Sequence, residues 1–193
     1  MGPRDIRVDK SLAKAHAHPM RRTRVTLALL VAFAVMSVAV PEASAHTVRP
    51  RGFSTRAVLK ERNTTVTSQL VAVRVGRHRT FERTVFELRG SLPSFESVKY
   101  VPRITEDGSG NPVPVAGRAF IEVVLMVQCG PGLEPGACPG APGIPRGFRT
   151  IRQEVHAGYF ESNATYGIGL SRRVGFRVFE LSNPPRVVVD VRR

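Results

Sequence analysis

The residues of this chain that could do chemistry are a few histidines, two cysteines, a loop serine and scattered acids. Beyond residue 45 the histidines are His46, His78 and His156, with neither an H-E-x-x-H motif nor a His/Cys cluster at zinc-ligand spacing. His78 is flanked by Arg77 and Arg79, whose charges oppose a divalent cation. We therefore expect these histidines to be exposed to solvent, and we predict no metal site and no cofactor.

The hydroxyls and carboxylates do not form a recognisable catalytic set. No G-x-S-x-G motif occurs, and Ser109 lies in Asp107–Gly110, a sequence typical of a tight hairpin loop. A glycosidase needs two carboxyl groups about 5–10 Å apart in a cleft. The acids that could be considered for this role are Glu106, Asp107, Glu122 and Glu154, but no motif groups them. We predict that the protein is not an enzyme.

The two cysteines, Cys129 and Cys138, lie in a Gly/Pro-rich stretch over residues 128–147. An even number of cysteines in an exported protein favours a disulfide, and a ring of this size would remove about 3 kcal/mol of chain entropy from the unfolded state. The stapled loop is either a stabilised insertion or a displayed recognition finger.

The formal net charge is +14, carried mainly by arginine. Such a surplus favours a polyanionic partner, although Arg-rich coding with a need for solubility explains it equally well. Proteins that bind single-stranded nucleic acid interleave aromatic side chains with cations. Here we expect the phenylalanines in question to be mostly in the core, so nucleic acid is not predicted as a partner. These residues are Phe81, Phe86, Phe176 and Phe179.

Residues 1–45 have the features of a cleavable export signal. Basic residues at Met20–Arg24 precede an apolar run over Val25–Val40, and Ala43-Ser44-Ala45 follows as an A-x-A cleavage site. Met20 is an alternative translation start. The apolar run is shorter than the roughly 20 residues that span a bilayer, and no cysteine at the cleavage point could carry a lipid. We expect a secreted protein without a stable membrane anchor.

Residues 46–67 carry a run of cations without sustained periodicity and are predicted to be a basic, flexible tether. From residue 68 to 193 short β-type runs alternate with turn residues, which predicts one all-β domain of sandwich or barrel type. The expected strands are Leu70–Val75, Arg83–Leu88, Val98–Ile104, Ala119–Val127, Ile151–Val155, Ser162–Leu170, Phe176–Leu181 and Arg186–Val191.

Two of these runs repeat one pattern. Arg83–Leu88 and Arg186–Val191 both read Arg, any residue, Val, apolar, acid, aliphatic, which favours an antiparallel sandwich with pseudo-repeated halves. Alternation along a strand places Arg83 and Arg186 on outward faces, together with Glu87 and Asp190. The two arginines are the candidate ligand-binding residues, because a guanidinium pairs bidentately with carboxylate or phosphate. The alternative is that they form ion pairs with these two acids.

Three separated motifs resemble AMIN-like domains, which occur in secreted proteins and lipoproteins of actinobacteria and are similar to the AMIN domain of cell-wall amidases and secretins. The motifs are Val73–Leu88, Asp107–Val113 and Phe176–Val191, and the resemblance covers Ser68–Val191. It implies an antiparallel β-sandwich targeted to the envelope through peptidoglycan or another periplasmic partner, without catalysis. The residues 128–147 resemble an insertion.

The sequence therefore predicts a non-catalytic, exported, cell-wall-associated module. Its partner would be peptidoglycan or another anionic wall polymer, or an envelope protein. The alternative is a secreted protein-binding or inhibitor domain that presents the Cys129–Cys138 loop.

Overall fold

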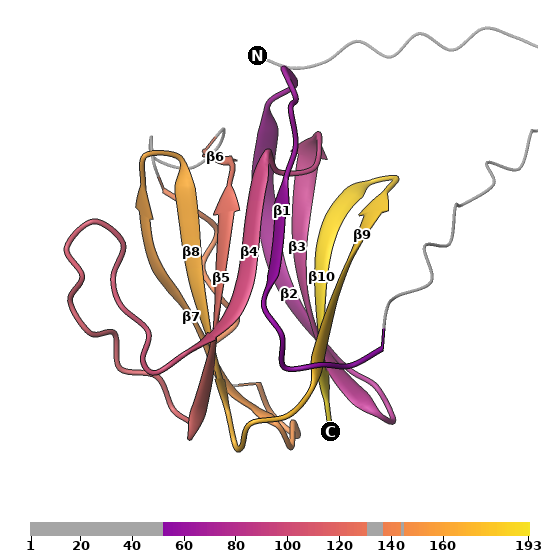
Figure 1. Cartoon of the computed structure of the whole chain (residues 1–193), viewed down its shortest axis with the longest axis vertical. Helices are drawn as coiled ribbons and strands as arrows, with labels where there is room; N and C mark the ends of the chain where they lie inside the picture. The colour runs from indigo at the N-terminus through magenta and orange to yellow at the C-terminus, as the bar shows by residue number, and fades with distance from the viewer. Residues whose placement is uncertain (1–51, 131–136, 144) are drawn as a thin grey trace, which may run out of the picture. The chain divides into compact units, whose positions relative to one another are not determined.

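The computed structural model describes residues 52–130, 137–143 and 145–193. They form two five-stranded sheets that pack face to face (Figure 1), with strand orders β1-β4-β5-β8-β7 and β6-β2-β3-β10-β9. The first sheet contains β1 (Val58–Glu61), β4 (Phe95–Val101), β5 (Ala119–Met126), β8 (Asn163–Leu170) and β7 (Ile151–Phe160). The second contains β6 (Gln128–Cys129), β2 (Ser68–Arg77), β3 (Phe81–Gly90), β10 (Pro185–Arg192) and β9 (Phe176–Ser182). No helix in the described residues is long and apolar enough to cross a membrane.

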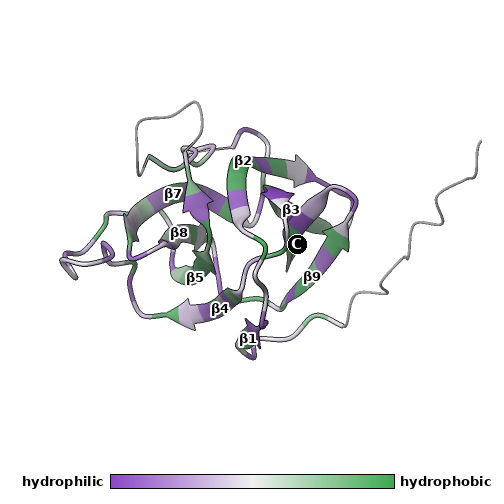
Figure 2. Ribbon diagram, turned by 90° about the horizontal axis from the view of Figure 1, so that it is seen from above, coloured by the Kyte–Doolittle hydropathy of each residue, from purple (hydrophilic) through white to green (hydrophobic). Residues whose placement is uncertain are grey.

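The antiparallel sandwich predicted from the sequence is confirmed, and each of the eight expected strands is present. All pairings are antiparallel except β2 with β6, which is parallel. Hydrophobic and hydrophilic positions alternate along the strands (Figure 2), as expected when one face of each sheet is buried. Phe86 on β3 meets Tyr166 on β8 edge to face at 5.2 Å, so the core lies between the sheets.

The two strands with the repeated pattern, β3 and β10, are neighbours in one sheet. Their antiparallel register places Arg83 opposite Asp190 and Glu87 opposite Arg186. Because the pattern has Arg at one end and an acid at the other, two antiparallel copies bring opposite charges together at both ends. The structure forms the ion pair at one of these ends, between Arg83 and Asp190.

The prediction of a flexible tether over residues 46–67 is wrong for Val58–Glu61, which form strand β1 and pair with β4. Residues 46–51 and the predicted signal peptide lie outside the described residues. Cations in and next to β1 find partners: Lys60 Nζ is 3.0 Å from the Glu96 carboxylate and 2.9 Å from that of Glu180, which Arg62 also contacts. Since Glu180 belongs to β9, this cluster joins the edges of the two sheets. Burial raises the pKa of Glu96, the nearby Glu180 raises it further, and Lys60 opposes both effects.

The strand registers define two ends of the sandwich. Ile151 and Ala119 both pair with Leu170, while Phe176 pairs with Val191. Consequently the segments 78–80, 116–118, 145–150 and 171–175 all lie at one end, together with the C-terminus (lower part of Figure 1). The segments 62–67, 91–94, 161–162 and 183–184 lie at the opposite end.

Candidate functional site

Arg83, one of the two candidate residues, is bound to a buried acid. Its Nε donates to Asp190 Oδ1 at 2.6 Å and its Nη2 to Oδ2 at 3.0 Å. Arg177 on β9 donates to the same Oδ2 from Nε at 2.9 Å and from Nη2 at 2.7 Å. Asp190 is fully buried although its side chain lies on the outer face of the sheet, because these two arginines cover it. Of the two alternatives for Arg83, the ion pair is the one present.

Aromatic rings hold both guanidinium groups in place. The Arg83 guanidinium carbon lies 5.0 Å from the Phe81 ring centroid and 5.2 Å from that of Phe179. The Arg177 guanidinium lies 4.6 Å from Phe53 and 5.0 Å from Phe81. We expected Phe81 and Phe179 in the core. Phe179 is buried, but both rings lie outside the cluster between the sheets and stack against guanidinium groups on the outer face of the sheet. Phe86 and Phe176 do lie in the core.

Arg186, the second candidate residue, lies near the opposite end of the same sheet face. Its guanidinium donates to the backbone carbonyls of Pro184 at 3.2 Å and Asn183 at 3.5 Å. The acid opposite it, Glu87, is contacted instead by Arg74 at 2.8 Å. The fold thus does not bring Arg83 and Arg186 into one site, because Arg186 pairs with Glu87, which lies four positions along β3 from Arg83.

Two buried acids have structural roles: Glu154, which was one of the acids considered for catalysis, and Glu82, which was not. Glu82, fully buried, accepts hydrogen bonds from the backbone N–H groups of Arg149, Thr150 and Ile151 at 2.5, 2.9 and 2.7 Å. It thereby fixes the chain just before β7 to β3. Glu154 lies between the sheets, where the Thr84 hydroxyl donates to it. Burial raises the pKa of Glu154 to about 8, although the Thr84 hydrogen bond opposes the shift.

The remaining candidate groups also have local roles. His156, which we expected to be exposed, is half-buried with its ring 4.9 Å from Tyr166, and burial lowers its pKa. Ser109 donates to Glu106 at 2.7 Å inside the 106–111 turn, as the hairpin reading predicted. Among the described residues no group of three or more His, Cys, Asp or Glu is placed to hold a metal ion.

The predicted disulfide is confirmed: Cys129 on β6 is bonded to Cys138, with their Cα atoms 4.7 Å apart. The buried hydroxyl of Tyr166 donates to the carbonyl of Pro139 at 2.6 Å, which anchors the chain just after the bridge to β8. Residues 131–136 of the loop lie outside the described part of the chain.

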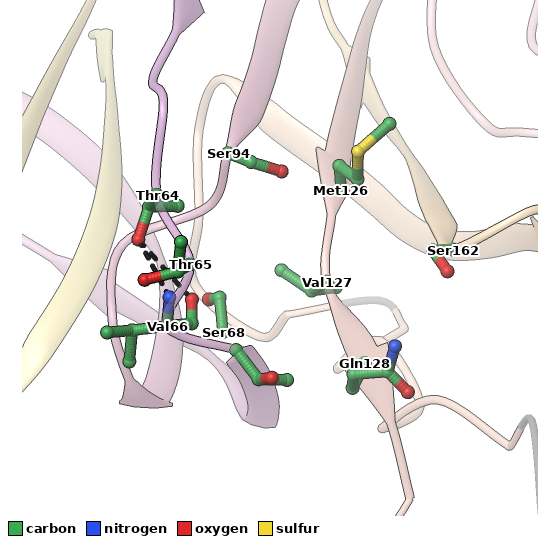
Figure 3. Close-up of a pocket in the computed structure, with 10 residues that line it drawn as sticks. Thr64, Thr65, Val66, Ser68, Ser94, Met126, Val127, Gln128 and Ser162 are labelled. Atoms are coloured by element: carbon green, nitrogen blue, oxygen red, sulfur yellow. Dashed lines mark hydrogen bonds between the residues drawn. The ribbon is translucent and has the colours of Figure 1, made fainter.

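Three of the cavities on the surface of the described part of the chain bear on function. One of about 240 Å³ is rich in hydroxyl groups, with residues 64–68 and Ser94 facing Met126–Gln128 and Ser162 (Figure 3). One of about 400 Å³ lies where the 105–107 loop meets β5, and its acids are Glu106, Asp107 and Glu122. One of about 720 Å³ is lined by residues 116–118, 149, 152 and 171–172, and four of these residues are arginines.

The family model for the AMIN-like domain matches residues 68–193. The chain belongs to the AMIN-like domain family. No curated protein and no solved structure matches the chain. The predicted family is therefore confirmed, and its membership suggests a cell-wall-related module with an envelope location.

Nine arginines of this AMIN-like domain that form no ion pair with a described residue gather at one end of the sandwich; Arg56, Arg89, Arg103 and Arg186 also lack an acid partner but are not part of this group. We call this group the arginine end. All its members are exposed, and they lie in the connecting segments at that end of the sandwich or in the strand ends next to them. They are Arg77, Arg79, Arg118, Arg146, Arg149, Arg152, Arg172, Arg173 and Arg192. These arginines were not predicted as binding residues. They could have been found from their positions in turns and at strand ends, where no acid is close in the sequence.

Proposed function

We propose that this protein is an exported, non-catalytic module that binds peptidoglycan or another anionic polymer of the cell wall. Membership of the AMIN-like family supports the location and the class of function. Residues 46–193, which remain after the predicted cleavage, contain 22 Lys or Arg and 12 Asp or Glu, a net charge of +10 that supports the sign of the partner's charge.

The observation that carries the proposal is the division between paired and unpaired arginines. On the outer face of the sheet, Arg74 is bound by Glu87, while Arg83 and Arg177 are bound by Asp190. Two acids thus offset most of the charge of these three arginines, whereas Arg89 and Arg186 of the same sheet have no acid partner among the described residues. The arginine end, by contrast, presents several exposed guanidinium groups together. We therefore assign the main polymer contact to the arginine end and a minor one to Arg186.

The environments of the acids support a non-catalytic role. Glu106, Asp107 and Glu122 line one open cavity, but Ser109 donates to Glu106 and Lys99 pairs with Glu122 there. An acid–base pair must reach its substrate in a cleft. The Glu82 carboxylate accepts hydrogen bonds from three backbone N–H groups. Glu154 is enclosed between the sheets, where the Thr84 hydroxyl donates to it. Both side chains are buried, so neither can reach a substrate in a cleft.

The test is cosedimentation of the purified protein with isolated cell-wall material. Wild-type protein should sediment at 50 mM NaCl and be released at about 1 M, where the Debye length falls to about 3 Å. The triple variant Arg79→Gln/Arg146→Gln/Arg173→Gln should bind the wall at least about fivefold more weakly, since surface arginines act additively through local charge.

The matched control is Arg74→Gln/Arg89→Gln/Arg186→Gln, which removes the same charge from the outer face and the opposite end. It should retain most of the wall binding. Equal losses in the two triple variants would contradict the assignment to the arginine end. Absence of wild-type sedimentation at low salt would contradict wall binding itself.

A further inference from the structure

The largest of the three cavities has an unusual charge. Its lining includes Arg118, Arg149, Arg152 and Arg172 but no acidic residue, and its volume is about 720 Å³. None of the four guanidinium groups forms an ion pair with a residue that the structure describes. The four positive charges around the cavity repel one another, and a bound anion would offset this repulsion.

The backbone around the cavity is held in place before any ligand arrives. Arg118 N–H donates to the Leu170 carbonyl at 2.7 Å, and Ser171 N–H donates to the Thr150 carbonyl at 2.8 Å. Glu82 binds the backbone at Arg149, as described above. The three segments that carry the arginines are therefore fixed to one another, so the cost of ordering the backbone has been met in the free protein.

Two glycines permit this close approach. A Cβ on Gly169 would lie 2.1 Å from the Ala116 carbonyl oxygen, and one on Gly117 would lie 2.7 Å from the backbone of Leu170. Gly117 also has a φ of +149°, which other residues rarely adopt. The 116–118 segment can pack on β8 only because neither position carries a side chain.

Two further details concern the polar groups of the lining. The register of β7 shifts between Ile151 and Gln153, so Arg152 lies at a bulge, a feature that commonly redirects a side chain. The hydroxyl of Ser171 is buried and has no hydrogen-bond partner in the described protein. The Ser171 hydroxyl and the guanidinium groups are hydrogen-bond donors, and an oxyanion in the cavity is the acceptor that suits them.

We propose that this cavity is a discrete binding site for a polyanion segment that carries at least two oxyanion groups, phosphodiester or carboxylate, within its length. Its volume falls in the range of about 300–1,000 Å³ found for sites of drug-sized ligands, so it accepts more than one small ion. Four guanidinium groups match several negative charges rather than one. The inference rests on the proposed function, because a cell-wall polymer is the source of such a segment.

The experiment is calorimetric titration of the full-length protein with three probes: inorganic phosphate, a glycerol-phosphate oligomer and an oligogalacturonate. At 100 mM NaCl we expect at least one oligomer to bind with 1:1 stoichiometry and at least tenfold more tightly than phosphate. A tighter glycerol-phosphate complex assigns the site to phosphodiesters, and a tighter oligogalacturonate complex assigns it to carboxylates.

Two variants of equal net charge separate the cavity from the general charge of this end. Arg118→Gln/Arg152→Gln should weaken oligomer binding by more than tenfold, while Arg79→Gln/Arg173→Gln should weaken it by less than threefold. Unchanged melting temperatures would show that both variants fold. Equal weakening in both, or no preference for an oligomer over phosphate, would overturn the inference.

These outcomes are distinct from failure of the proposed function. If the cavity is not a discrete site, wild-type protein still cosediments with the wall through the whole arginine end. If wall binding is absent, wild-type protein does not cosediment even where an oligomer binds in the cavity.

Discussion

Replacement of Glu154 by Gln should change how the stability of this domain depends on pH. The Glu154 side chain is 3% exposed and is enclosed between the sheets, where the Thr84 hydroxyl donates to one carboxylate oxygen and the other has no partner in the described protein. In this setting the protonated acid is favoured, and burial raises its pKa from 4.5 to about 8. Gln has the shape of the protonated acid and cannot ionise.

The size of the effect follows from this pKa. Between pH 4.5 and 8 the folded protein keeps a proton that the unfolded chain has released, so the stability contributed by Glu154 is lost as pH rises through this window. At 1.36 kcal/mol for each pKa unit, wild-type protein should lose about 4 kcal/mol of unfolding free energy relative to Glu154→Gln between pH 5 and 9. That is a large share of the roughly 5–15 kcal/mol typical of a domain.

The measurement is urea unfolding of both proteins at intervals from pH 5 to pH 9. Comparing the two at each pH removes the contributions of groups that they share, such as His156 with its lowered pKa. At pH 5 the two proteins should be nearly equal in stability, and at pH 9 Glu154→Gln should be the more stable. Glu122→Gln, at the half-buried acid that pairs with Lys99 at 3.2 Å, is the control and should show no such trend. A constant difference across the range would refute the argument.

Two other substitutions test what holds the sandwich together. Asp190→Asn removes the charge that binds Arg83 and Arg177 and should lower the unfolding free energy by about 3 kcal/mol, whereas Glu87→Gln, at the exposed pair with Arg74, should cost less than about 1 kcal/mol. Calorimetric or urea unfolding measures both, and equal losses would contradict a special role for Asp190. Cys129→Ser/Cys138→Ser should lower stability by about 3 kcal/mol through the entropy of the unfolded chain. If unfolding of this double variant matched that of the oxidised wild type, the bridge would have no such effect.

The strands could be predicted from the sequence because their signal is local. Apolar residues that alternate with polar ones, such as Phe86 and Leu88 on either side of Glu87, show which face is buried before any partner strand is known. The disulfide was predictable for a similar reason, since only two cysteines are present and they are close together in the chain. β1 was missed because Lys60 and its neighbouring cations resemble a solvated segment, and the acids that neutralise them lie far along the chain on β4 and β9.

The role of each arginine could not be predicted, because it depends on which acid the fold places beside it. Arg83 and Arg186 occupy equivalent positions in the repeated pattern, yet Asp190 holds the first, while Arg74 takes the acid opposite the second. Glu82 and Glu154 likewise read as ordinary surface acids until the opposite sheet encloses them.

The sequence by itself determined the family, the all-β fold, the faces of the strands, the disulfide and the excess of positive charge. Only the tertiary structure decided which charges are free, by bringing turns from distant parts of the chain to the arginine end. The physical reason is range: backbone alternation acts between neighbouring residues, whereas charge pairing and burial depend on contacts between residues that are up to 120 positions apart, as between Lys60 and Glu180.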